Sequence, residues 1–97
     1  MLLHLGGNVS VPLERLLFVL NDRGMTPRTR AYVERAKREH RYNSCAGTPK
    51  AYAVVQERGK EIVYASMIAS ATLEKRWRDE TGRRYLLDTA VVSVEWE

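Results

Sequence analysis

The chain has 97 residues, which is enough for one domain with one modest hydrophobic core and too short for a deep, enclosed active site. Hydrophobic residues make up 44% of the sequence and charged residues 29%, a balance that excludes an intrinsically disordered chain. The net charge is +4, and most of the basic residues are Arg, so the composition points to an anionic partner.

Two short strands joined by a tight turn are predicted at the start of the chain. The strands are Leu2–Leu5 and Val9–Pro12, and Gly6-Gly7-Asn8 between them supplies the backbone freedom that a hairpin turn requires. The apolar run Leu16–Leu20 fits either a buried strand or a buried helix. We favour a strand, because Asn21-Asp22-Arg23-Gly24 stops the run too early for a helix of normal length.

A helix with one basic side is predicted from about Pro27 to Arg41. Thr26 is a favourable N-cap, and proline at the first helical position gives up a hydrogen bond that the helix would not have made. Helical spacing puts five residues on a packing face, namely Thr29, Tyr32, Val33, Ala36 and His40. The remaining arc is basic and carries Arg28, Arg30, Arg35, Lys37, Arg38 and Arg41. Residues 23–41 contain two acids, Glu34 and Glu39, and their net charge is +5.

A loop and a second hairpin come next along the chain. Asn43–Pro49 is rich in small and turn-forming residues, which is typical of a loop. Ala51–Gln56 and Glu61–Ser66 have the composition of paired strands, and Gly59 lies at the tight position of the turn between them.

The last predicted elements are a second helix and a tail. The helix is capped by Ser70 and runs to about Asp79, with Leu73 and Trp77 four residues apart on its buried face. We expect Thr81-Gly82 to end it. In the tail, Val91–Trp96 reads either as a strand or as a segment that becomes ordered only against a neighbour.

These elements predict an α+β fold in a single domain. A small antiparallel β-sheet of short hairpins packs with two α-helices. We assign residues 1–80 to this domain and residues 81–97 to a C-terminal extension, with Val91–Trp96 as an extra strand where it pairs.

No catalytic motif is present in the sequence. It has no Gly-rich phosphate loop ending in Lys-Ser/Thr, no His-Glu-x-x-His and no Gly-x-Ser-x-Gly. His4 and His40 lack partners at metal-ligand spacing, so we expect them to be packed or surface residues. The single cysteine, Cys45, rules out an intrachain disulfide and a cysteine-based zinc site, and we expect a packing residue there. We therefore expect no enzyme, no cofactor, no metal and no small-molecule substrate.

The expected location is the cytoplasm. The longest apolar stretch, Leu16–Leu20, is too short to span a bilayer, so we expect no membrane partner. The first residues lack the basic leader and the long apolar region of a signal peptide. A single cysteine is also typical of a reducing compartment.

Basic residues on the first helix and in turns form the predicted nucleic-acid site. A charged outer face is also what any solvated helix shows. Few acids neutralise this one, however, and turns allow backbone phosphates to approach. Aromatic residues are sparse among the basic ones, which favours a duplex over a single strand. The predicted contacts to double-stranded DNA are Arg15, Arg28, Arg30, Arg35, Lys50, Arg58 and Lys60.

Several short segments also occur in a characteristic order. They are Leu3-His4-Leu5-Gly6-Gly7, the Val11-Pro12 to Leu16-Leu17 turn, the Thr26-Pro27 helix start, Gly47-Thr48-Pro49-Lys50, and Tyr64-Ala65-Ser66 followed by Ser70-x-Thr72-Leu73-x-Lys75-Arg76. In this order and spacing, from about Met1 to Arg76, the chain resembles the extracellular matrix regulator family, RemA and RemB. It is closer to the RemB-like branch.

The resemblance implies a small bacterial DNA-binding regulator, active on biofilm-matrix genes in the RemA branch, that assembles into ring-shaped homo-oligomers. It places Arg15 near the family's functional Arg. RemA-like proteins carry a run of arginines after the loop Gly, whereas here Gly47 is followed by Thr48-Pro49-Lys50. Either Lys50 acts with Arg58 and Lys60 in place of that run, or this branch binds DNA weakly or differently. The alternative is an oligomeric scaffold whose basic face binds an acidic protein.

Overall fold

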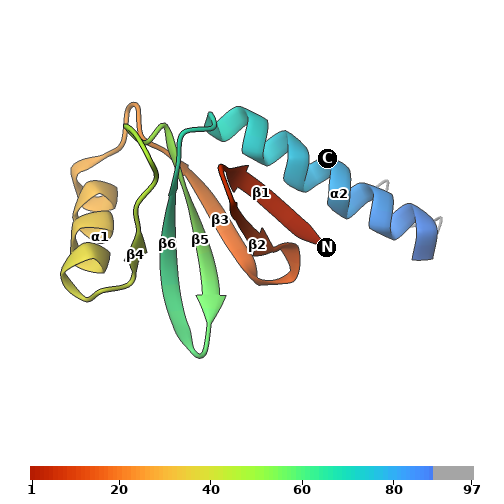
Figure 1. The fold of residues 1–97 in the computed structure, drawn as a ribbon, viewed down its shortest axis with the longest axis horizontal. Coiled ribbons are helices and arrows are strands. Elements are labelled where there is room, and N and C mark those ends of the chain that lie inside the picture. Colours follow the sequence, from red (N-terminus) through yellow and green to blue (C-terminus); the bar gives the residue numbers. More distant parts are fainter. Residues whose placement is uncertain (89–97) are drawn as a thin grey trace.

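The computed structural model describes residues 1–88, with side chains described through residue 80. These residues contain six strands, two α-helices and one 3₁₀-helix. In chain order they are β1 (Leu2–Gly6), β2 (Val9–Pro12), η1 (Leu13–Arg15), β3 (Leu16–Asn21), α1 (Pro27–Arg38), β4 (Tyr42–Asn43), β5 (Ala51–Glu57), β6 (Lys60–Ser66) and α2 (Ser70–Asp88). The two helices lie at opposite ends of the molecule with the strands between them (Figure 1). The predicted α+β fold is confirmed.

The strands form two sheets. β1 and β2 make an antiparallel hairpin, and a second sheet has the order β3-β5-β6-β4. In this second sheet β3, β5 and β6 are antiparallel neighbours, whereas β4 runs parallel to β6. The sheet is therefore mixed, and β4 lies where the sequence predicted only the end of a helix and a loop.

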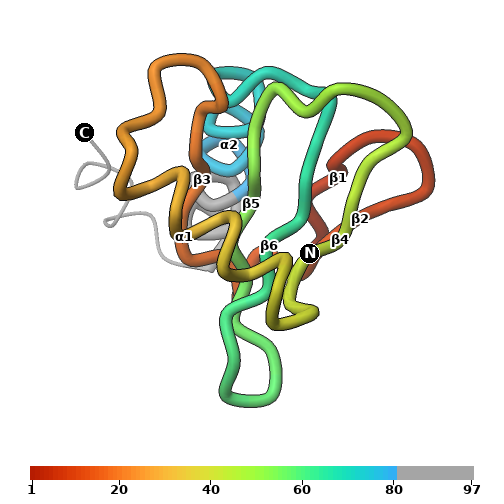
Figure 2. Tube along the Cα trace, turned by 90° about the vertical axis from the view of Figure 1, so that its left-hand side faces the viewer, coloured from red at the N-terminus to blue at the C-terminus, as the bar shows by residue number. Residues whose placement is uncertain are grey.

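Backbone conformation explains why both hairpins turn where the sequence predicted. Gly6 and Gly7 between β1 and β2 have φ values of 105° and 57°, a region that glycine enters without steric cost. Between β5 and β6 the two turn residues are Arg58, with φ 50°, and Gly59, with φ 78°. Two consecutive positive values are the signature of a type I′ turn, whose twist matches that of the flanking strands. Seen from the side of α1, this turn extends beyond the rest of the molecule (Figure 2).

Two hydrophobic cores lie on the two faces of β5. Successive side chains of a strand point to opposite faces. The first core packs β5 against the β1–β2 hairpin, η1, β3 and α2, and its buried residues are Leu3, Leu5, Val11, Leu13, Leu16, Ala51, Ala53, Val55 and Leu73. The second core packs the sheet against α1, and its buried residues are Val33, Ala36, Tyr52, Val54, Val63 and Ala65. Leu16–Leu20 is thus a strand, as favoured from the sequence.

The first helix ends at Arg38, three residues before its predicted end at Arg41. His40 adopts the left-handed conformation with φ 60°. Its amide donates to the Lys37 carbonyl at 3.2 Å, and the Arg41 amide donates to the Ala36 carbonyl at 2.8 Å. This pair of bonds is a Schellman motif, which closes a helix. His40 is consequently exposed, so its predicted place on the packing face is wrong.

The second helix is longer than predicted. Leu73 is fully buried and Trp77 packs partly buried against the same core, as expected. The helix nevertheless continues through Thr81-Gly82 to Asp88, so the predicted boundary between residues 80 and 81 falls inside α2. A single glycine inside a helix costs only about 1 kcal/mol relative to alanine, which its neighbours can offset. The predicted strand Val91–Trp96 lies outside the described residues.

Ser66 is the one polar residue among the described side chains that is fully buried. Its hydroxyl donates to the Leu5 carbonyl at 2.7 Å and accepts from the Ile68 amide at 3.0 Å. One side chain therefore joins the end of β6, the first hairpin and the segment that leads into α2.

We expect Ser66→Ala to lower the free energy of unfolding by about 1–3 kcal/mol, because the buried Leu5 carbonyl and the partly buried Ile68 amide both lose their partner. Urea denaturation of the purified protein measures the change. Ser44→Ala, in an exposed loop, is the matched control and should change stability by less than about 0.5 kcal/mol. Equal stability of the two variants would show that the Ser66 hydroxyl is dispensable.

Candidate nucleic-acid interface

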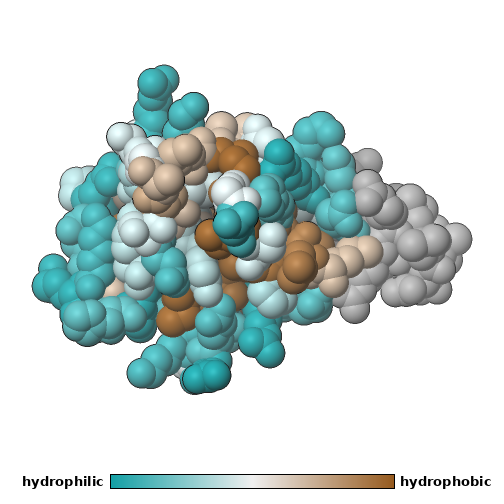
Figure 3. All heavy atoms as spheres, viewed as in Figure 1, coloured by the Kyte–Doolittle hydropathy of each residue, from teal (hydrophilic) through white to brown (hydrophobic). Residues whose placement is uncertain are grey.

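Helix α1 presents its basic side to solvent because its other side is fixed to the sheet. The Thr26 hydroxyl accepts the Thr29 amide at 3.2 Å, which caps the first turn as predicted. Val33 and Ala36 are fully buried against the sheet. Most of the charged residues of α1 then lie away from the sheet, where the surface is hydrophilic (Figure 3).

Three arginines of α1 line one shallow groove. Arg28, Arg35 and Arg38 surround about 310 Å³ of space, with Ala31 and Tyr32 as its floor. Among the described residues Arg28 and Arg38 form no ion pair, and Arg35 reaches Glu39 only at 4.0 Å. Two of the predicted contacts, Arg28 and Arg35, are thus brought together. The third arginine, Arg38, was on the predicted basic arc but not in the predicted site.

Arg30 has a different environment from the groove arginines. Its guanidinium donates to the Asp22 carboxylate at 3.0 Å and to the Asp22 carbonyl at 3.1 Å. The buried Tyr52 hydroxyl donates to the same carboxylate at 2.8 Å. The bonds from Tyr52 and Arg30 hold the pKa of Asp22 below its ordinary value. Arg30 therefore ties α1 to the end of β3.

A second group of polar contacts joins α1 at Tyr32, and the segment after α1 at Arg41, to strand β6. The Tyr32 hydroxyl donates to the Glu61 carboxylate, and Arg41 donates to the Glu61 carbonyl at 2.6 Å. Arg41 also pairs with Glu39 at 2.7 Å. Lys37 lies 5.0 Å above the centre of the Tyr42 ring, which adds a cation–π contact. Arg41 and Lys37 are thus engaged within the protomer.

The remaining predicted contacts lie at opposite ends of the sheet. Arg15 ends η1, Arg58 lies in the β5–β6 turn, and Lys60 is the first residue of β6. These three share one end, since β3 starts where β5 ends and Leu16 pairs with Val55. Lys50 precedes β5 at the other end. At the rise of a strand, roughly 25 Å separates it from Arg58. The seven predicted contacts therefore do not form one patch on a single protomer.

Two features of the site were missed by reasoning from the sequence. Arg38 lies three residues after Arg35, and residues at this spacing are neighbours on the surface of a helix. The second is Arg23, which lines a pocket together with Lys50. Its position next to Lys50 depends on the pairing of β3 with β5, for which the sequence contains no direct signal.

The side chains considered for other chemistry are held in simple ways. His4 is exposed, and its Nδ1 lies 3.4 Å from the Ser10 hydroxyl. The Cys45 thiol donates to the Gly47 carbonyl at 3.2 Å, and the residue packs partly buried against the second core. Within the described part of the chain, no three His, Cys, Asp or Glu side chains gather where they could hold a metal. No helix there is long and apolar enough to cross a membrane.

No family model and no curated protein matches the chain. The resemblance to the extracellular matrix regulators therefore depends on the short segments that carry it.

Three tyrosines that hydrogen-bond to carboxylates make stability sensitive to alkaline pH. Burial, and then the bond to Glu61, Asp22 or Glu57, raises the pKa of Tyr32, Tyr52 and Tyr64 from 10.0 to about 12. The neutral phenol is thus favoured in the folded state, so this stabilisation is complete below pH 10 and is lost as the pH rises to about 12.

We expect the free energy of unfolding to fall across that range, as measured by chemical denaturation at a series of pH values. Tyr64→Phe removes one of the three titrating groups and should make the fall less steep. A stability that stays constant over the range would contradict this assignment.

Proposed function

We propose that this protein is a small bacterial transcription regulator that binds the backbone of double-stranded DNA and acts in the cytoplasm as a ring-shaped homo-oligomer of the RemA/RemB extracellular matrix regulator family. The observation that carries the DNA proposal is the row of Arg28, Arg35 and Arg38 on the outer side of α1. The short segments shared with the family support the family and the ring. No catalytic role is part of the proposal.

The spacing of this row suits a DNA backbone. From Arg28 to Arg38 the helix rises about 15 Å, a length over which one DNA strand, which advances roughly 3.4 Å along the duplex axis per nucleotide, presents several phosphates. The planar guanidinium donates two parallel hydrogen bonds to phosphate oxygens. Contacts of this kind position a protein on DNA without reading its sequence.

One protomer offers few such contacts, and this is the argument for assembly. Three arginines neutralise about as many phosphates, which supports only weak, salt-sensitive binding. Linking several copies turns later contacts into intramolecular ones and raises the affinity without any new type of contact. A ring in which the copies meet end to end along their sheets would also bring Arg15, Arg58 and Lys60 of one copy near Lys50 of the next, although these residues lie at opposite ends of the sheet within one protomer.

The double variant Arg28→Gln/Arg38→Gln tests the DNA interface. In an electrophoretic shift assay with duplex DNA at several salt concentrations, we expect weaker binding to all sequences. The slope of log Kobs against log salt should become shallower by about 0.9 for each phosphate that the variant no longer neutralises. Arg78→Gln, an exposed arginine on α2, makes the same kind of charge change away from α1 and should bind almost as the unmodified protein does.

Absence of any retardation at low salt, even at high protein concentration, would sink the DNA proposal. Intact oligomers in that case would favour the scaffold alternative, in which the basic face binds an acidic protein.

The oligomer is tested separately by light scattering on the purified chain. We expect a native mass several times that of one protomer, and a larger mass again when duplex DNA is added. A strictly monomeric protein under both conditions contradicts the ring.

A further inference from the structure

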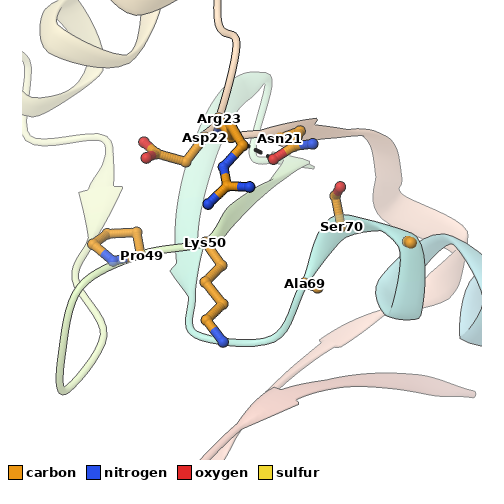
Figure 4. A pocket seen from close by; sticks show the side chains of 8 residues that line it. Asn21, Asp22, Arg23, Pro49, Lys50, Ala69 and Ser70 are labelled. Carbon is orange, nitrogen blue, oxygen red and sulfur yellow. Dashed lines mark hydrogen bonds between the residues drawn. The ribbon is translucent and has the colours of Figure 1, made fainter.

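An open pocket with polar and apolar walls lies at the end of the sheet away from the β5–β6 turn. It has a volume of about 490 Å³ where β3 ends, β5 begins and α2 begins. This volume is within the usual range for small-molecule sites. In Figure 4, Arg23 and Lys50 lie on the side of the pocket opposite Ser70, and the Lys50 side chain extends toward the segment that leads into α2.

The walls of the pocket are held by hydrogen bonds within the protein. The Asp22 amide donates to the Lys50 carbonyl at 3.0 Å, and the Lys50 amide donates to the Ser66 carbonyl at 2.8 Å. At the end of β3, the Arg23 amide donates to the Asn21 side-chain oxygen at 3.1 Å. The backbones that carry the two cations are therefore fixed before any ligand arrives, which lowers the entropy lost on binding.

The charge inside the pocket is positive. Neither Arg23 nor Lys50 forms an ion pair with a described residue. Asp22 is the acid in the wall, but its carboxylate points away from the cavity in Figure 4 and already accepts from Tyr52 and Arg30. An anion in the pocket would thus meet two cations and no unneutralised carboxylate.

We propose that this pocket binds a small phosphate-bearing molecule, with Arg23 and Lys50 as its charged contacts. Arg23 supplies a planar fork and Lys50 a point charge, the two ways in which proteins usually hold phosphate. The Ser70 hydroxyl is a further donor, and Pro49 and Ala69 give the organic part of the ligand an apolar wall. The pocket lies at the start of α2, apart from the α1 groove that contacts the DNA backbone in the function proposed above, and its volume suits a small molecule.

The test is calorimetric titration of the full chain with pyrophosphate at constant ionic strength and without DNA. We expect saturable binding that Lys50→Met and Arg23→Met each weaken at least tenfold. Arg78→Met, which removes the same charge from an exposed position of α2 outside the pocket, should bind as the unmodified protein does. Both pocket side chains are exposed, so the variants should fold, and thermal melting checks this.

The titration and the DNA assay can each overturn the proposal that this pocket binds phosphate. Absence of saturable binding, or equal affinity in the Lys50, Arg23 and Arg78 variants, overturns it. Weaker binding of duplex DNA by Lys50→Met with pyrophosphate binding unchanged also overturns it and makes Lys50 a DNA contact. Because the titration contains no DNA, its failure leaves the proposed regulator function untouched, and failure of the DNA assay leaves the pocket untouched.

Discussion

The side chains of β5 from Ala51 through Val55 are all buried, and they alternate between two cores. A strand covered on both faces needs a layer on each side, so the first hairpin and α2 must occupy one face and α1 the other. Ala51 and Ala53 on the hairpin side leave room for Leu3 and Leu73 to approach closely. The position of α1, and with it the basic groove, follows from this requirement.

Polar bonds determine which basic residues are available once α1 is in place. Arg30 and Arg41 are turned toward the sheet by Asp22 and by the Glu61 carbonyl. Both lie on the basic arc predicted from the sequence, yet both join elements of the fold. The arginines that remain in the outer groove are those whose positions along the helix face no acid of the sheet. Residues 23–41 carry a net charge of +5. Because some of their basic side chains are paired within the protomer, only the others face outward.

The sequence predicts the strands and hairpins well, because glycine at the turns and apolar runs of strand length are local signals. It predicts the helix ends poorly. At His40 a non-glycine residue takes the left-handed conformation that usually marks glycine, whereas Gly82, which looks like a stop, lies inside α2. The two-residue strand β4 is too short for a periodic signal, and it exists because the segment after α1 pairs with β6. These outcomes depend on tertiary contacts.

The distinction between local sequence signals and tertiary contacts also applies to the basic residues of the candidate site. Charge counted along the chain groups Lys50 with Arg58 and Lys60, because they are close in sequence. An extended strand then carries them to opposite ends of the sheet, and the pairing of β3 with β5 brings Lys50 beside Arg23 instead. A strand is extended, so basic residues less than ten positions apart can lie at its two ends. A helix turns every 3.6 residues, so basic residues such as Arg28, Arg35 and Arg38 lie together on its outer side. A basic stretch in a sequence therefore indicates a basic surface only where the stretch is helical or where neighbouring chains join its ends.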